Sequence, residues 1–143
     1  MHGLQRLEYR GYDSAGLVVF DETQGMHKQK SVGKVASLSD KIAKYKAGLP
    51  DAHKSSYGIA HTRRATHGGV TEENCHPHTS NNGKVHLVHN GIIENYVKLR
   101  KKLEAAGYTF YSETDTEVIA NLVQYHWSGD LSQAVHKTVE EIR

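Results

Sequence analysis

The stretch "YRGYDSAGLVVF", residues 9–20, joins a polar segment to an apolar one, and each of the two contains one glycine. The apolar half, residues 15–20, predicts a buried strand, because short continuous apolar runs are typical of strands covered on both faces. Just before it, Leu4 and Leu7 predict the end of a helix that Gly11 closes. A polar segment held between two packed elements is a natural place for side chains that form a site.

Strand and helix patterns alternate along the rest of the chain. Residues 21–25 predict a turn and residues 26–32 the second strand of a hairpin. Thr114 followed by Glu117 predicts a capping box at the start of a helix. Further strands are expected at 57–60, 84–89 and 108–111, and further helices at 34–45, 96–106, 114–126 and 131–142. Such mixing of strands and helices in layers indicates the α+β or α/β class, and we expect α+β.

Length and composition exclude several function classes. With 143 residues, the chain fits one domain, and its 37% hydrophobic and 24% charged residues are typical of a soluble globular protein. It has no apolar run near the roughly 20 residues needed to span a bilayer. The net charge of +2 is too small to indicate nucleic-acid binding. Together with the single cysteine, Cys75, these features predict a cytoplasmic protein without a nucleic-acid or membrane partner.

Asn90 and Gly91 follow the strand expected at 84–89. The asparagine amide can donate to an oxygen, and glycine lets its backbone N–H approach a ligand closely. The two together could form an oxyanion hole. The alternative is a plain Asn-Gly turn, which the spacing alone favours.

The segment "HTRRATHGG", residues 61–69, also follows a predicted strand. Arg63 and Arg64 could clamp a carboxylate, because guanidinium groups form bidentate pairs with it. Thr66 and His67 offer polar contacts beside them. The alternative is a solvated loop.

Asp115 follows the strand expected at 108–111 and could accept an ammonium group. The alternative role is electrostatic stabilisation of a helix N-terminus. Sites in layered folds gather at strand ends, so we expect the three loops to meet. A cation for a carboxylate, an anion for an amine and donors for an oxyanion suit an α-amino acid with a side-chain acyl group.

Five motifs identify a family resemblance. They are "LEYRGYDSAG" (7–16), "GIAHTRRATHG" (58–68), "CHPH" (75–78), "VHNGIIENY" (88–96) and "SETDTEVIANLV" (112–123). Together they resemble the glutaminase domain of glucosamine–fructose-6-phosphate aminotransferase, a class II glutamine amidotransferase that uses no cofactor in this step. The resemblance implies an N-terminal-nucleophile fold, an αββα sandwich. We expect residues 1–143 to hold part of that domain, without its first and late strands and without the sugar-isomerase domains.

The resemblance also implies how L-glutamine is bound. Arg63 would bind its α-carboxylate, with Thr66 and His67 lining the same pocket, and Asp115 would hold its α-amino group. Position 64 departs from the family, which has tryptophan there in a role linked to closing the site. Family members are homo-oligomers, and the oligomeric state of this chain is left open.

For catalysis, the resemblance implies that Asn90 and the Gly91 N–H form the oxyanion hole and that Arg10 supports the surroundings of the nucleophile. The family's nucleophile is an N-terminal cysteine, whose own α-amine is the base. Cys75 lies mid-chain and lacks that amine, so we do not expect it to substitute. The 143 residues as written are therefore predicted to be inactive.

Two alternatives remain open. One is the glutaminase domain of another class II amidotransferase, such as asparagine synthetase or the purine enzyme. The other is a non-enzymatic module that binds glutamine or a metal. Possible metal ligands are His61, His67, His76, His78, His86 and His89. However, strand alternation places His86 and His89 on opposite faces, which is unfavourable for chelation, and no metal is expected.

Overall fold

A computed structural model of the protein describes residues 1–22, 25–48, 55–65 and 68–143. The chain forms two compact units, residues 1–77 and 78–143. Both contain helices and antiparallel strands, which confirms the α+β class. Within the described ranges, no helix combines the length and apolar character needed to cross a membrane.

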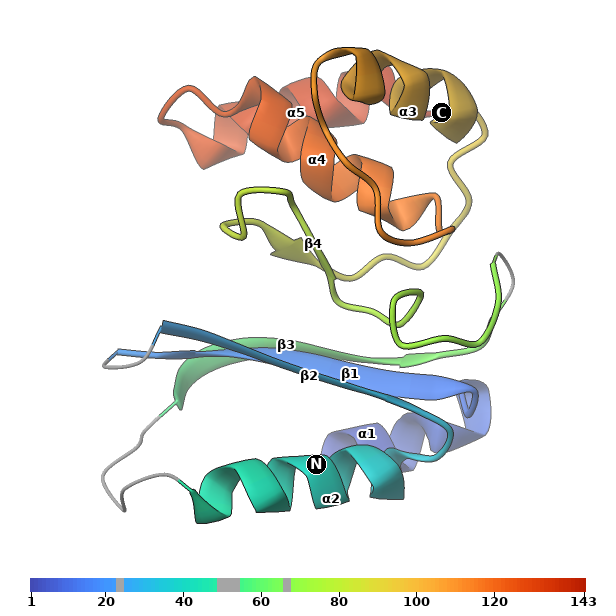
Figure 1. The fold of residues 1–143 in the computed structure, drawn as a ribbon, viewed down its shortest axis with the longest axis vertical. Helices are drawn as coiled ribbons and strands as arrows, with labels where there is room; N and C mark the ends of the chain where they lie inside the picture. Colours follow the sequence, from blue (N-terminus) through green and yellow to red (C-terminus); the bar gives the residue numbers. More distant parts are fainter. Residues whose placement is uncertain (23–24, 49–54, 66–67) are drawn as a thin grey trace. The chain divides into compact units, whose positions relative to one another are not determined.

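The first unit is a three-stranded antiparallel sheet in the order β2-β1-β3. Strands β1 (Ser14–Asp21) and β2 (Gly25–Val32) form the predicted hairpin, and β3 (Ser55–Arg63) is longer than the strand predicted at 57–60. Helices α1 (His2–Leu7) and α2 (Val35–Ala47) cover one face of this sheet (Figure 1). The buried core between the helices and the sheet consists of Leu4, Ala15, Val35 and Leu38.

The segment between α1 and β1 is a short 3-10 helix, η1 (Glu8–Arg10), which ends at Gly11 as predicted. A Cβ atom at Gly11 would lie 2.8 Å from the carbonyl oxygen of Thr62. Only glycine therefore allows the opening segment to approach the end of β3 this closely. In this way the first polar segment of the sequence is placed beside the residues that begin the "HTRRATHGG" loop.

The second unit pairs two short strands with three helices. Strands β4 (His78–Thr79) and β5 (His86–Leu87) are antiparallel. The helices α3 (Tyr96–Ala105), α4 (Thr116–His126) and α5 (Leu131–Glu141) confirm the predicted helices (Figure 1). Helix α4 shares one core with α3 and another with α5. The residues of the two cores are Ile93, Leu99, Leu103, Val118 and Leu122, and Val85, Val123 and Ala134.

Two predicted strands of this unit differ from the structure. The strand expected at 108–111 does not form, because the amide of Asn81 satisfies the backbone of Thr109 on both sides. The Asn81 Nδ2 donates to the Thr109 carbonyl at 2.6 Å, and the Thr109 N–H donates to Asn81 Oδ1 at 2.7 Å. The strand expected at 84–89 is also limited to His86–Leu87.

The capping box expected from Thr114 and Glu117 is wrong as well. Asp115 is the N-cap residue of α4 and makes no side-chain capping bond. The carboxylate of Glu117 reaches further back, where it accepts the N–H of Tyr111 at 3.0 Å and that of Ser112 at 2.7 Å. These bonds use backbone donors that a strand would otherwise have supplied to a neighbour.

Candidate active site

Arg63 lies at the end of β3 and is buried, with 5% of its surface exposed. Its Nη1 donates to the carbonyl oxygen of Gly69 at 3.2 Å, and Asn74 Nδ2 donates to the same oxygen at 3.0 Å. The contact fixes the Arg63 side chain against the segment that follows its own strand.

Asp13, in the opening segment, holds the chain just after Arg63. Its carboxylate accepts the N–H of Ala65 at 2.7 Å, and its own N–H donates to the Arg63 carbonyl at 3.1 Å. The N–H of Gly33 in turn donates to the Asp13 carbonyl at 2.7 Å. Asp13 was not among the predicted site residues, although its place in the opening motif was a signal that it has a role.

The other site residues predicted in the first unit are either exposed or outside the described residues. Arg10 lies in η1 with an exposed side chain, so its assignment as a support for the nucleophile stays a prediction. Arg64 is also exposed. Thr66 and His67 lie outside the described residues.

Cys75 is fully buried in the first unit. Its Sγ donates to the carbonyl oxygen of Thr71 at 3.1 Å. Burial raises the pKa of the Cys75 thiol above its usual range, and the weaker opposing influences of Ser14, Lys30 and Arg63 do not reverse this. A protonated, inaccessible thiol is a poor nucleophile, so these features favour a structural role.

The segment before Pro77 lies directly against β1. A Cβ atom at Gly16 would approach the carbonyl oxygen of His76 to 2.1 Å, and the His76 ring stacks on that of His61 at a centroid distance of 4.5 Å. The second glycine of the opening motif thus allows the "CHPH" segment to lie on the strand.

In the second unit, Asp115 ties two predicted site segments together. It is buried at the start of α4, and its Oδ2 accepts the N–H of Ile93 at 2.7 Å. Its Oδ1 accepts the hydroxyl of Thr116 at 3.3 Å. The bond to Ile93 fixes the chain two residues after Gly91, so the structure brings Asp115 and the Asn90–Gly91 turn into one neighbourhood.

The Asn90–Gly91 turn has the geometry that glycine permits. Gly91 has a φ of +154°, and a Cβ atom there would lie 2.8 Å from Nε2 of His89. The His89 ring faces Thr116, with Nδ1 3.4 Å from the hydroxyl oxygen. Asn90 and Gly91 are exposed. Their role as the two donors of an oxyanion hole stays a prediction.

A buried polar network next to Asp115 was not predicted from the sequence. Ser112 Oγ donates to Glu117 Oε2 at 2.6 Å and lies 3.0 Å from Thr114 Oγ1, which is itself 3.0 Å from Nε2 of His78. The capping-box reading of Thr114 and Glu117 hid this network, because it assigned both side chains to the helix backbone.

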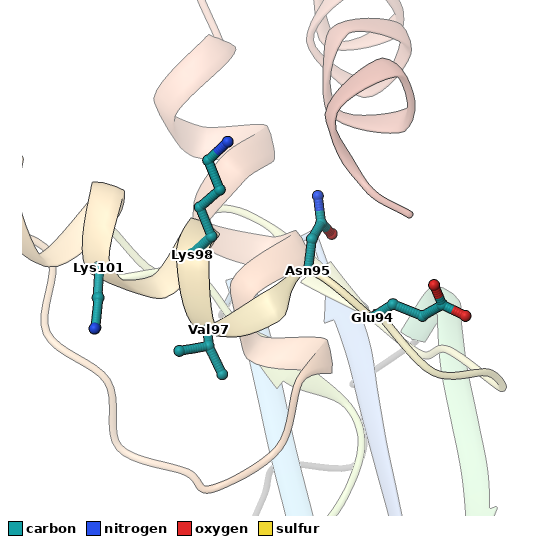
Figure 2. A pocket seen from close by; sticks show the side chains of 5 residues that line it. All are labelled: Glu94, Asn95, Val97, Lys98 and Lys101. Atoms are coloured by element: carbon teal, nitrogen blue, oxygen red, sulfur yellow. The ribbon is translucent and has the colours of Figure 1, made fainter.

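Two further features lie apart from these residues. A surface pocket at the start of α3 is lined by Glu94, Asn95, Val97, Lys98 and Lys101 and contains none of the predicted site residues (Figure 2). Across the described part of the chain, no group of three histidine, cysteine, aspartate or glutamate residues is arranged to hold a metal ion.

Comparison with known proteins decides the family. Residues 61–138 match the family described as "Glutamine amidotransferase domain". The chain belongs to this family. It is 45% identical over 143 residues to the glutamine–fructose-6-phosphate aminotransferase (isomerizing) of Thermus thermophilus, and 50% identical over 145 residues to that of Acinetobacter baylyi. All of the chain is covered in both alignments, but it spans 22% of the length of these relatives.

Solved structures of the same kind of domain confirm the N-terminal-nucleophile fold. The glutamine phosphoribosylpyrophosphate amidotransferase of Bacillus subtilis, complexed with ADP and GMP, is 28% identical with a TM-score of 0.75. A structure of the allosteric regulatory enzyme of purine biosynthesis is 30% identical with a TM-score of 0.76. Each alignment covers 99% of this chain and 29% or 30% of the other chain.

Proposed function

We propose that these residues belong to the glutaminase part of a cytoplasmic glutamine–fructose-6-phosphate aminotransferase, which takes ammonia from glutamine for the synthesis of glucosamine 6-phosphate. The observation that carries the proposal is identity of 45–50% along the chain to enzymes of that name. Identity to the purine enzymes is 28–30% over the same length, so the aminosugar reaction is favoured over the purine one.

In this proposal, each polar group of glutamine has a partner of opposite character. Arg63, with Thr66 and His67, binds the α-carboxylate, and Asp115 binds the α-amino group. Asp115 suits this role because its two oxygens offer about four acceptor sites, and the bonds from Ile93 and Thr116 use two of them.

The amide end of glutamine meets the Asn90–Gly91 turn. As a thiolate attacks the amide carbon of glutamine, negative charge develops on the amide oxygen. Hydrogen-bond donors that are already in position stabilise that charge. Asn90 Nδ2 and the Gly91 N–H would be the donors, while Arg10 supports the surroundings of the nucleophile. Cys75 is buried with a raised pKa, so we expect residues 1–143 alone to bind glutamine without hydrolysing it.

Calorimetric titration with three ligands tests the binding roles. 4-Carbamoylbutanoate lacks the amino group of glutamine, and 4-aminobutanamide lacks its carboxylate. Asp115→Asn should weaken glutamine binding roughly 10- to 100-fold and leave binding of 4-carbamoylbutanoate unchanged. Arg63→Ala should weaken glutamine binding similarly and leave binding of 4-aminobutanamide unchanged.

Asp130→Asn is the matched control, because Asp130 is the N-cap residue of α5 and accepts the N–H of Gln133 at 3.1 Å. It should bind all three ligands like the unaltered chain. Equal losses for all ligands in Asp115→Asn would contradict the assignment of the amino group to Asp115. Failure of the unaltered chain to distinguish glutamine from the two analogues would contradict the proposed site.

A further inference from the structure

In the polar network beside Asp115, the donor and the acceptor of each hydrogen bond can be assigned by counting protons. Glu117 receives three donors, from the N–H groups of Tyr111 and Ser112 and from the Ser112 hydroxyl. A carboxylate group only accepts, so the single proton of the Ser112 hydroxyl points to Glu117.

The remaining links then have only one arrangement. Because the Ser112 proton is used, the 3.0 Å contact with Thr114 requires the Thr114 hydroxyl to donate to Ser112. The Thr114 proton is then also used, so at the 3.0 Å contact with His78 the threonine oxygen accepts. Nε2 of His78 must therefore carry a proton. The hydrogen bonds form a chain in which His78 donates to Thr114, Thr114 to Ser112 and Ser112 to Glu117.

The side chains of all four residues in this hydrogen-bond chain are buried. An unsatisfied polar group in such a place is costly, so each link holds its neighbours in place. Asp115 lies between Thr114 and Glu117 in sequence, and both of these residues are fixed by the network. The carboxylate of Asp115 can therefore reach the N–H of Ile93 only while the turn from 112 to 117 keeps its shape.

We infer that His78 is a positioning residue for Asp115: its Nε2–H sets the direction of a hydroxyl chain ending at Glu117, and this chain fixes the turn from which Asp115 binds Ile93. The link from Asp115 to the amino group of glutamine rests on the proposed function. The second histidine of "CHPH" thereby gains a role in substrate binding without touching the substrate.

Long-range ¹H–¹⁵N correlation of the His78 ring at pH 8 shows which ring nitrogen carries the proton, and so which way the hydrogen bonds run. We expect a protonated Nε2. A bare Nε2 would overturn the inference, because the Thr114 hydroxyl would then have to donate to His78 and could not also donate to Ser112.

The positioning role is tested through the Ile93 amide, which donates to Asp115. His78→Ala should speed hydrogen exchange at Ile93 by about tenfold or more, the effect of losing one net hydrogen bond. His78→Gln keeps a side-chain N–H donor and should restore exchange to within about threefold of the unaltered chain. His86→Ala is the matched control, because His86 contacts a hydroxyl, that of Thr79, at 3.0 Å outside this network.

Two results would contradict the role: unchanged exchange at Ile93 in His78→Ala, or equal acceleration in His86→Ala. The amide of Leu103, which is buried in the core of α3 and α4, reports whether a variant remains folded. If His78→Ala unfolds, Thr114→Val and Thr114→Ser replace it, since the valine removes the hydroxyl link and the serine keeps it. Only the valine should then accelerate exchange at Ile93, and equal exchange in the two variants would overturn the inference.

Glutamine titration separates this inference from the proposed function. If both hold, His78→Ala lowers glutamine affinity by about tenfold, and His78→Gln restores it. If the Ile93 amide responds as expected but the unaltered chain does not bind glutamine, the positioning of Asp115 stands and the proposed function fails. If glutamine binds equally well to all variants, the role of His78 in substrate binding is refuted.

Discussion

The backbone of Gly16 lies so close to the carbonyl of His76 that a Cβ atom at position 16 would be 2.1 Å from the oxygen. Gly16 is the third residue of β1, and His76 lies just before the end of the first unit. Neither atom belongs to a flexible side chain that could move aside. The contact explains why the opening motif ends in a glycine at a strand position, where glycine is otherwise unfavourable.

Gly16→Ala should therefore lower the free energy of unfolding by about 1–3 kcal/mol or more, as overpacking does. Gly3→Ala is the matched control, because a Cβ atom at this helical position in α1 meets nothing within 4 Å. It should raise the free energy of unfolding by up to about 1 kcal/mol. Urea denaturation followed by circular dichroism measures both, and similar midpoints for the two variants would refute the close contact.

Gly91→Ala should disturb the Asn90 turn more than it disturbs the fold. Its φ of +154° is rarely adopted by other residues, and the new methyl would press on the His89 ring. We expect a loss of about 1–3 kcal/mol in the free energy of unfolding and weaker glutamine binding. Gly83→Ala, in a loop with φ of +72° and open space around its Cβ position, is the control for backbone strain alone. It should leave glutamine binding unchanged, and equal effects on binding would contradict the role of the turn.

Cys75 should resist alkylation in the folded chain. Burial raises the pKa of its thiol, so at pH 8 less of it is thiolate than in a free cysteine, and the sulfur is also inaccessible. Iodoacetamide labelling should be about 100-fold or more slower in buffer than in about 8 M urea, where the chain is unfolded.

Glutamate release from glutamine should be absent both in the unaltered chain and in Cys75→Ala. Turnover abolished by that substitution would show that Cys75 is a nucleophile after all.

Acid should weaken the contact that joins α3, α4 and α5. Glu141 Oε2 lies 2.8 Å from Lys102 Nζ, and Oε1 lies 2.8 Å from His126 Nε2. The hydrogen bond from Lys102 is the main cause that lowers the pKa of Glu141 below 4.5. A carboxylate with a lowered pKa stabilises the fold above its unfolded pKa, and this contribution is lost as the pH falls through the folded value.

Stability measured from pH 6 to pH 3 should therefore fall less steeply in Glu141→Gln than in the unaltered chain. The difference should be below about 1 kcal/mol, because the pair is partly exposed. Glu140→Gln is the matched control on the same helix, since Glu140 pairs only at 3.4 Å with His136 at a well-exposed position. Identical slopes for Glu141→Gln and the unaltered chain would contradict the prediction.

Local pattern was sufficient for most elements of the fold. The hairpin of β1 and β2 and the helices α2 to α5 follow from apolar periodicity and turn residues, which act within a few positions. The strand expected at 108–111 failed for a nonlocal reason. Its apolar pattern is real, but Asn81, 28 residues away, satisfies the backbone of Thr109 with a side-chain amide.

The residue types of the candidate site could also be read from the sequence, because a cation, an anion and an amide suit the groups of glutamine whatever the fold. The contacts that hold these residues in place could not be read from the sequence. Asp115 depends on Ile93, 22 residues earlier, and Thr114 depends on His78, 36 residues earlier. A sequence pattern shows which side chains are polar, but only chain folding decides which polar groups meet.

The α+β class and the amidotransferase resemblance followed from the sequence alone, because periodicity and motif chemistry are local properties. The residues that would bind glutamine remain a prediction from the same motifs. The tertiary structure was needed to show that Gly16 makes room for His76, that Asp13 holds Ala65 and that the His78 ring meets the Thr114 hydroxyl. These contacts join residues far apart along the chain. Buried polar groups must find partners wherever folding places them, and that requirement is absent from any single stretch of sequence.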